Sequence, residues 1–576
     1  MPSRTRASLR ALLVPALGAW LIVCAPSARA AWPPDPTVNV PLCTTAFSSR
    51  ITRAVPDGRG GAIAVWWEDR SGDFDVFARR VDSTGVAQWA ANGVPVCVTT
   101  PGTSQVLPKA VPDGVKGTIV VWIDSRLGAN ALFAQRVDSS GTRRWGDAGV
   151  LLASTKSSQV TEFDVAADGA GGIAVAWATP VSGISSDIYA QRLNAAGALL
   201  WGTNAKALCT INTDQAHPQI VCKASGKFVV AWEDQRNAFR TDIYGQSLDA
   251  AGTLLWALNG IPLANAADSD INPLLVASGA DDCILAWDAD SLGVGDIRAQ
   301  HLTATGAAAW PAAGQHMFPE GVSGLLAVAP DNAGGMYLVT SVPEAVSGKT
   351  SLWLQRVRAT GSPVYVLAGR RVSSVPSNQT QVVVAPDNAG GLLLTWLDDQ
   401  RNLPKLDVLA QRMDLAGNPQ WALAGVPVCR AGNTGPGLCI APSGNGAVIA
   451  WSDTRTTTSP DIYAQGVDAL GQLAAPALAV DPPVLRPESL LAAPSPNPAA
   501  RSASITYTLP GVGRVLLSVV DPTGRLVAVL DAGVRYAGRH MVTWDAQASG
   551  RRLPPGVYLV QLTTEAGTES RRLVLL

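Results

Sequence analysis

One unit of about 55 residues occurs eight times in this chain, and this repeat limits the possible folds more than any other feature. A tryptophan after an apolar run marks each unit, except that threonine replaces it in the sixth: Trp66, Trp122, Trp177, Trp232, Trp287, Thr340, Trp396 and Trp451. A segment resembling DIYAQRVD follows, as at Asp461, and then a glycine. A second aromatic comes four residues after that glycine in seven of the eight units.

Each unit is predicted to contain four short strands. A turn such as Pro56-Asp57-Gly58 precedes a strand that rises to the tryptophan, and the AQR segment alternates like a third strand. Four strands per unit, repeated eight times, predict an all-β fold, namely an eight-bladed β-propeller with four-stranded blades. Residues 38–43 (VNVPLC) are expected to complete the eighth blade, whose own fourth strand is degenerate. The alternative is a linear or superhelical array.

The repeats also resemble a known group. Their W-x-D-x-R, DIYAQRVD, glycine and tryptophan sequence over about 50–475 is similar to the tandem repeats of secreted bacterial proteins, a largely uncharacterised group. This resemblance implies the architecture and no activity.

The first thirty residues are predicted to be a signal peptide. Three arginines precede an apolar run over 11–23, and Ala28-Arg29-Ala30 is a small-x-small cleavage pattern, so cleavage is expected after Ala30. A lipoprotein signal ending at Cys24 is the alternative. No later apolar run reaches about 18 residues, so the mature chain is predicted to have no transmembrane segment. We expect a bacterial protein that is secreted or displayed on the outer cell surface.

A different composition begins after Asp481. Six prolines between 482 and 498 predict a stiff linker, and at least six short strands follow in about 80 residues, which indicates a small β-sandwich. The motifs PSPNP, DPTGRLV, GRHMVTWDA and LPPGVYLVQL resemble the immunoglobulin-like domain of the flagellar hook-capping protein and the sorting domain of type IX secretion. We divide the chain into a signal peptide (1–30), a β-propeller (31–481), a Pro-rich linker (482–500) and an immunoglobulin-like sorting or anchoring domain (501–576).

Charge and composition exclude several classes of function. The 44 cations and 45 anions give a net charge of −1, and the predicted mature chain has 40 cations and 45 anions, so no nucleic-acid partner is expected. Four histidines leave little room for a histidine metal site or a Ser-His-Asp triad. No nucleophile elbow, phosphate loop or zinc-ligand pair is present.

The recurring W-x-D-x-R motif supplies the candidate ligand-binding residues. They are Glu68, Arg70, Asp124, Arg126, Asp234, Arg236, Asp453 and Arg455. A further candidate is Trp67, which stands outside the repeated tryptophan positions and next to Glu68. Asp–Arg pairs at the ends of the second strands are positioned to hold sugars or carboxylates around a channel mouth, whereas the alternative is that they fix each loop. Carboxylates such as Asp69 and Asp124 are possible glycosidase acids. No catalytic residue is assigned.

The cysteine spacing predicts two disulfides, and the turns offer no clear metal site. Seven cysteines remain after signal removal, and Cys209–Cys222 and Cys429–Cys439 are the predicted disulfides because each pair flanks one loop. Turns such as Asp331-Asn332 and Asp387-Asn388 offer oxygens for calcium, but hairpin turns explain them better, so no metal and no cofactor are predicted.

These observations favour an exported binding or adhesion platform rather than an enzyme. The expected partners are an extracellular glycan or protein and, through the C-terminal domain, the secretion or cell-envelope machinery. Two alternatives stay open, a secreted polysaccharide hydrolase or lyase that uses loop-face carboxylates and a structural surface-layer component.

Overall fold

The protein is described by a computed structural model, and all structural statements refer to its described residues. These are 32–98, 102–153, 160, 162–182, 185–237, 240–266, 269–291, 293–322, 324–344, 347–401, 406–431, 434–444, 446–455, 459–473, 490–509, 513–535, 538–548, 551–564 and 567–576. The predicted signal peptide and residues 482–489 of the predicted linker lie outside them. The chain divides into two compact units, Met1–Ala477 and Leu478–Leu576.

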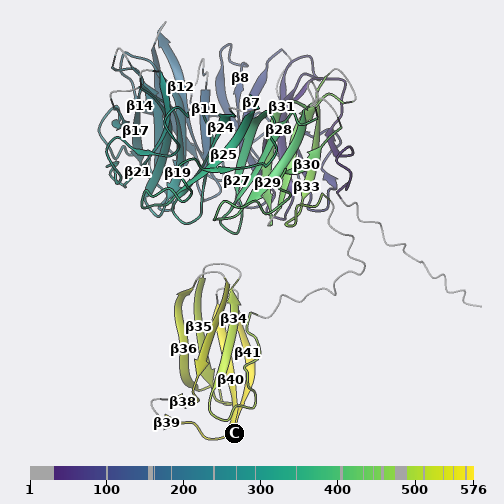
Figure 1. Ribbon diagram of the computed structural model, residues 1–576, viewed down its shortest axis with the longest axis vertical. Coiled ribbons are helices and arrows are strands. Elements are labelled where there is room, and N and C mark those ends of the chain that lie inside the picture. Colours follow the sequence, from purple (N-terminus) through teal and green to yellow (C-terminus); the bar gives the residue numbers. More distant parts are fainter. Residues whose placement is uncertain are drawn as a thin grey trace, which may run out of the picture. The chain divides into compact units, whose positions relative to one another are not determined.

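The first unit is built from β-sheets alone within its described residues, which contain no helix (Figure 1). They form eight antiparallel sheets, which we number 1 to 8 in chain order. The first strands of the sheets are β2 (Ser49–Pro56), β7 (Gln105–Pro112), β11 (Glu162–Ala167), β15 (Gln215–Cys222), β19 (Ser269–Ser278), β23 (Leu325–Pro330), β27 (Gln379–Pro386) and β31 (Thr434–Ser443). The second strands, which end near the repeated tryptophan, are β3 (Ala62–Glu68), β8 (Thr118–Asp124), β12 (Ile173–Ser182), β16 (Phe228–Asp234), β20 (Asp282–Ser291), β24 (Met336–Pro343), β28 (Leu392–Asp398) and β32 (Gly446–Asp453).

The third strands carry the AQR segment. They are β4 (Asp75–Val81), β9 (Ala131–Val137), β13 (Ser185–Leu193), β17 (Asp242–Leu248), β21 (Val294–Leu302), β25 (Thr350–Val357), β29 (Asp407–Met413) and β33 (Asp461–Val467). The outer strands are short: β5 (Ala87–Gln88), β6 (Val94–Pro95), β10 (Val150–Leu151), β14 (Lys206–Cys209), β18 (Ile261–Ala264), β22 (Gln315–His316), β26 (Arg370–Arg371) and β30 (Val426–Cys429), together with β1 (Val40–Cys43) in sheet 8.

The first strands of the sheets contact one another in series. Each meets the first strand of the next sheet, and β31 of sheet 8 meets β2 of sheet 1. Apolar side chains fill the space between neighbouring sheets, including sheets 8 and 1, where Leu42, Ile51 and Trp66 pack with Val448 and Ile462. Because the series returns to its start, the first strands are the innermost ones. This arrangement fits a β-propeller.

The N-terminal segment completes sheet 8. Strand β1 pairs antiparallel with β33, as the sequence predicted. Trp32 also takes the place of the second aromatic that this repeat lacks, since its Nε1 donates to the Ser83 carbonyl of sheet 1 at 3.1 Å. In the other sheets, Trp89, Trp145, Trp201, Trp256, Trp310, Tyr365 and Trp421 make the same bond to the next sheet.

These aromatic bonds explain the glycine that ends each AQR segment. Gly85 has φ +84°, and a Cβ atom there would lie 2.9 Å from the Trp32 ring. A side chain would therefore collide with the aromatic ring of the preceding sheet as well as strain the backbone. The repeated glycine and the repeated aromatic form one contact between neighbouring sheets.

The second unit has its own core. Strands β35 (Gly513–Val520), β36 (Leu526–Arg535), β40 (Gly556–Thr564) and β41 (Gly567–Leu575) form one sheet, and β34 (Ala503–Leu509) pairs with β37 (Gly538–Trp544). The two-residue strands β38 (Gln547–Ala548) and β39 (Arg551–Arg552) form a third pair. Leu491, which the sequence placed in the linker, is buried in this core, so the packed unit begins earlier than predicted.

Candidate functional site

In sheets 1, 2, 4 and 8, the W-x-D-x-R residues contact one another within their own sheet. The carboxylates of Glu68, Asp124, Asp234 and Asp453 are fully buried. Each accepts a hydrogen bond from the indole Nε1 of the tryptophan two residues earlier, at 3.1, 2.8, 3.0 and 3.2 Å respectively. We call one tryptophan, its carboxylate and the following arginine a repeat cluster.

The arginine of each repeat cluster folds back onto its own carboxylate. Arg236 bonds Asp234 at 2.7 Å and Arg455 bonds Asp453 at 2.6 Å, and Arg70 and Arg126 do the same with Glu68 and Asp124. The guanidinium groups also lie over an aromatic ring of the third strand, with centroid distances of 3.8, 3.9, 3.5 and 4.0 Å for Arg70, Arg126, Arg236 and Arg455. These contacts fix the loop after each second strand. Ligand binding by these residues stays a prediction.

Two repeat clusters show how the arginine sets the carboxylate. Burial raises the pKa of Glu68, but hydrogen bonds from Arg70, Thr45 and Trp66 outweigh burial and hold the pKa below its usual range. In sheet 7 the arginine is displaced by one residue, and Arg401 bonds Asp407 instead. The pKa of Asp398 is therefore raised by burial.

Trp67 belongs to a different environment. It is half-buried, its ring meets Phe74 edge-on at 4.5 Å, and the guanidinium of Arg50 lies 5.3 Å from its centroid. It stays a predicted ligand contact.

The two predicted disulfides are wrong in this structure, because all seven cysteines of the described chain are free thiols. Cys209 ends the outer strand of sheet 3, whereas Cys222 ends the innermost strand of sheet 4. Cys429 likewise ends the outer strand of sheet 7, and Cys439 lies within the innermost strand of sheet 8. Residues that flank one loop in sequence thus lie at opposite edges of neighbouring sheets.

The turns that suggested calcium use their oxygens internally. Asp331 accepts backbone hydrogen bonds from Ala333 and Gly335 on one oxygen and the guanidinium of Arg356 on the other, and Asp387 does the same with its own partners. Among the described residues, no group of three His, Cys, Asp or Glu side chains is placed to hold a metal ion.

The innermost strands carry a second set of polar residues, which does not repeat. Most of these strands contain a β-bulge near the level of the tryptophan, and the bulge residues Leu107, His217, Asn272 and Gln381 have φ between 50° and 55°. Bulges re-aim side chains, and a non-glycine residue in this region is strained. We call the exposed and half-buried side chains of the eight innermost strands, with those that contact them, the inner wall.

His217 lies between two glutamates on this wall. Its Nδ1 is 3.0 Å from Glu233 of the adjacent strand and its Nε2 is 3.6 Å from Glu162 of sheet 3. The imidazole is 60% exposed, whereas Glu233 is 13% exposed. The hydrogen bond to Glu233 raises the pKa of His217 to about 9, so the imidazole is protonated at neutral pH.

The glutamate partner is itself held in place. The backbone N–H of Asn272 donates to Glu233 at 2.7 Å, and the Asn272 amide donates to Asp288 at 2.9 Å and to the Leu325 carbonyl at 2.8 Å. These bonds link sheets 4, 5 and 6. They orient Glu233, which in turn orients His217.

Sequence reasoning missed this cluster because it followed the repeated carboxylate two residues after the tryptophan. Glu233 and Asp288 come directly after Trp232 and Trp287, and no other repeat has an acid there. This departure from the repeat was the available signal.

A cavity of about 230 Å³ lies beside the cluster on the same wall. Thr52, Arg53, Leu107, Pro108, Lys109, Asp164 and Val165 line it. Lys109 pairs with Asp164 at 3.1 Å, and the same carboxylate accepts the backbone N–H of Ile220 at 3.1 Å.

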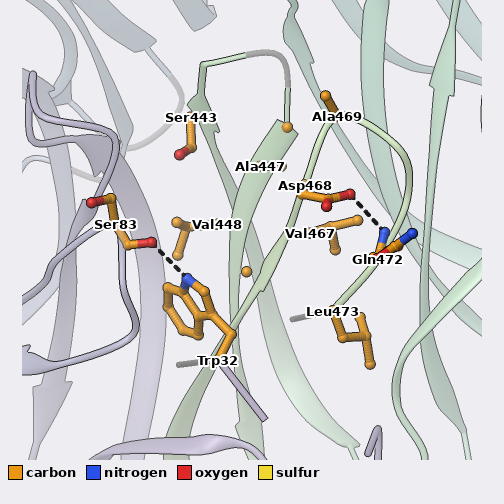
Figure 2. A pocket seen from close by; sticks show the side chains of 12 residues that line it. Trp32, Ser83, Ser443, Ala447, Val448, Val467, Asp468, Ala469, Gln472 and Leu473 are labelled. Atoms are coloured by element: carbon orange, nitrogen blue, oxygen red, sulfur yellow. Dashed lines mark hydrogen bonds between the residues drawn. The ribbon is translucent and has the colours of Figure 1, made fainter. Parts of the chain in front are cut away.

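A cavity of about 170 Å³ lies where sheets 8 and 1 meet (Figure 2). Ser443 and Gly466 stand there at the positions where sheets such as 1 and 2 have the pairs Asp57–Arg80 and Asp113–Arg136. Trp32 packs against Gly466, whose Cβ would lie 2.5 Å from the indole nitrogen. The missing ion pair thus makes room for Trp32, and this cavity belongs to the contact between sheets 8 and 1.

Comparisons with solved structures return mainly enzymes at low similarity. The polysaccharide lyase Uly1 has a TM-score of 0.41 and 10% identity over 62% of this chain and 88% of that one. The propeller domain of the Trilobed protease from Pyrococcus furiosus has 0.36 and 11% over 63% and 95%. The α-L-arabinofuranosidase arb93a from Fusarium graminearum has 0.33 and 11% over 54% and 93%.

The prediction from sequence that the protein is not an enzyme is withdrawn, because the similar solved structures are mainly enzymes. At 10–11% identity and TM-scores below 0.5, they assign no activity to this chain. No curated protein matches the chain. The described residues also contain no helix with the length and apolarity needed to cross a membrane. In the second unit, residues 499–568 match the family model of the FlgD Ig-like domain.

Proposed function

We propose that the first unit is a closed eight-bladed β-propeller that cleaves a polysaccharide by general acid–base chemistry on its inner wall. The observation that carries this proposal is the exposed imidazole of His217, held between Glu233 and Glu162. The FlgD Ig-like unit would then sort, anchor or assemble a secreted protein, in line with the signal-peptide pattern of residues 1–30.

Each residue of the cluster has a defined role. Protonated His217 donates the proton of Nε2 to the glycosidic oxygen as the bond from that oxygen to the anomeric carbon breaks. Once the leaving sugar has departed, water bonds the anomeric carbon through its oxygen and returns a proton to Nε2, while the carboxylate of Glu162, 3.6 Å from Nε2, stabilises the positive charge that develops on the sugar ring. Glu233 keeps the imidazole protonated and oriented.

The composition of the cluster favours glycoside cleavage over acyl transfer. Within the described residues, His217 and its two carboxylate partners have no serine or cysteine in hydrogen-bond contact, so a covalent acyl intermediate lacks a nucleophile. Carboxylate and imidazole groups instead suit proton transfer to and from sugar oxygens.

The test is cleavage of a panel of neutral and acidic polysaccharides by the full exported chain, measured as new reducing ends. His217→Asn is the informative variant because asparagine tolerates the positive φ of this bulge but is no acid. We expect it to lower kcat at least about 100-fold. Glu162→Gln should do the same, and thermal unfolding should change only slightly in both variants.

Gln381→Asn is the matched control, since Gln381 has φ 50° at the equivalent bulge of sheet 7. It should leave cleavage unchanged. Retained activity in His217→Asn would overturn the proposal. Binding of a glycan without cleavage by the wild-type chain would also overturn it and would favour a glycan-binding platform.

A further inference from the structure

The charges of the inner wall are not spread evenly. At one level of the wall, opposite the residue before each tryptophan, the innermost strands of sheets 1 to 4 carry Arg53, Lys109, Asp164 and Gln219. At the same level, Leu274, Ala327 and Val383 follow in sheets 5 to 7. The repeat requires no charge at this position, so the cations of sheets 1 and 2 are a local specialisation.

The cations next to the cavity are incompletely neutralised. Lys109 has one carboxylate partner, Asp164, which also accepts the N–H of Ile220. Arg53 is exposed and has no carboxylate partner among the described residues. Thr52 and Pro108 also line the cavity, and the Thr52 hydroxyl donates a hydrogen bond to the Pro108 carbonyl at 2.7 Å. The cavity therefore presents net positive charge.

This cavity adjoins the His217 cluster through strand β11. Asp164 of the cavity and Glu162 of the cluster are two residues apart, so they lie on the same face of the strand, about 7 Å apart along it. A sugar ring seated beside Arg53 and Lys109 would place the next sugar of the chain beside Glu162 and His217. The volume of about 230 Å³ is below the range of about 300–1,000 Å³ typical of drug-sized ligands and suits a single ring.

We infer that the substrate is an acidic polysaccharide, and that Arg53 and Lys109 bind the carboxylate or sulfate of the sugar next to the cleaved bond. This inference rests on the proposed function. Arginine pairs with a carboxylate through two parallel hydrogen bonds, whereas lysine acts as a point charge, so Arg53 is the residue that selects the anionic sugar.

The experiment compares Arg53→Gln with the control Arg59→Gln, an exposed arginine on the turn after the same strand. Cleavage and binding are measured separately with polyuronate, sulfated polysaccharide and neutral polysaccharide. We expect Arg53→Gln to raise KM for an acidic polymer about tenfold with kcat little changed. Wild-type binding should weaken with salt, and Arg59→Gln should match the wild type.

The outcomes separate this inference from the proposed function. Cleavage of a neutral polymer alone, unaffected by Arg53→Gln, would overturn the acidic substrate and leave the catalytic proposal standing. Salt-dependent binding of an acidic polymer without any cleavage would overturn the catalytic proposal and leave the anion site standing. If Lys109→Gln and Arg53→Gln both leave binding of all polymers unchanged, the cavity binds no substrate.

Discussion

The repeat clusters and the inner-wall cluster both contain carboxylates near the repeated tryptophan, but their surroundings differ. Asp234 is fully buried and bonds Trp232 and Arg236 within one sheet. Glu233, the next residue back along the same strand, points to the other face and bonds His217 and the N–H of Asn272. The alternation of a strand thus gives two neighbouring acids opposite tasks.

This difference shows how repetition separates architecture from function. A carboxylate present in most sheets, with the same partners in each, is explained by what every sheet needs. A carboxylate present at only one or two equivalent positions requires another explanation, and the inner wall of sheets 3 to 5 is where such residues gather.

The largest change in stability is expected when the carboxylate of a repeat cluster is removed. Asp234→Ala leaves the Arg236 guanidinium and the Trp232 indole without their buried acceptor, so we expect a loss of about 3–5 kcal/mol in the free energy of unfolding. Urea denaturation followed by tryptophan fluorescence measures it. Asp147→Ala is the control, since Asp147 is exposed, and it should change stability by less than about 0.5 kcal/mol.

A repeat-cluster carboxylate whose removal leaves stability unchanged but abolishes ligand binding would reverse the comparison. Asp234 would then be a ligand contact, which is one of the two interpretations of its motif, and the hydrogen bonds of its cluster would be incidental to the fold.

Substitution of Trp32 tests whether a residue outside the repeats stabilises the fold as the repeat clusters do. Its ring is 6% exposed and closes the contact between sheets 8 and 1. Trp32→Ala should cost about 3 kcal/mol by urea denaturation, with early loss of protection from hydrogen exchange in β1. Trp32→Phe keeps the packing and loses one hydrogen bond, so it should cost about 1 kcal/mol. Equal stability of all three proteins would mean that the N-terminal segment does not close the ring.

The repeats made the architecture predictable. The spacing of Trp66, Trp122 and their equivalents predicted a four-stranded unit, and residues 38–43 were correctly expected to complete sheet 8. Both are local patterns, because strand alternation and turn residues lie close together in sequence. The role of Trp32 was not predicted, because Trp32 lies near the start of the chain whereas Gly466, on which it packs, belongs to the last sheet.

The inner wall was not predictable for a related reason. His217, Glu162 and Glu233 come from three strands of two sheets, and a bulge of His217 sets their distances. Sequence spacing indicates neither which face a bulged residue occupies nor which strand lies opposite it. The predicted disulfides were wrong for the same reason, since Cys209 and Cys222 are close in sequence but belong to different sheets.

A smaller effect is expected from pH, and it acts on the inner wall alone. The pKa of His217 is raised to about 9 by Glu233, with Glu162 and Asp214 adding to the shift, whereas an unfolded histidine titrates near 6.5. The associated stabilisation is complete below pH about 6.5 and is lost as pH rises through 9. Activity should fall about tenfold per pH unit above 9, because the acid is then deprotonated.

His217→Asn should remove this pH dependence of stability, which is modest because the imidazole is 60% exposed. Glu233→Gln should instead shift the alkaline limb of activity to lower pH. A limb that stays at the same pH in Glu233→Gln would show that His217 is not the group that titrates.

The smallest effect is expected from the cysteines of the repeat clusters, which sharpen the comparison within one site. The Sγ of Cys209 lies 3.8 Å from the Asp234 carboxylate and 3.5 Å from Arg236, and burial raises the pKa of its thiol to about 12. A thiol that stays protonated fills space and carries no reactivity. Cys209→Ala should therefore lower the free energy of unfolding by about 1 kcal/mol, well below the loss on Asp234→Ala in the same cluster.

A thiol reagent gives a second test. In the native protein at neutral pH it should modify half-buried Cys222 before Cys209. Unfolding without reductant should then expose seven reactive thiols in the predicted mature chain. Fewer than seven would mean that the protein forms a disulfide, and then the loss of stability on Cys209→Ala would exceed that of a simple packing change.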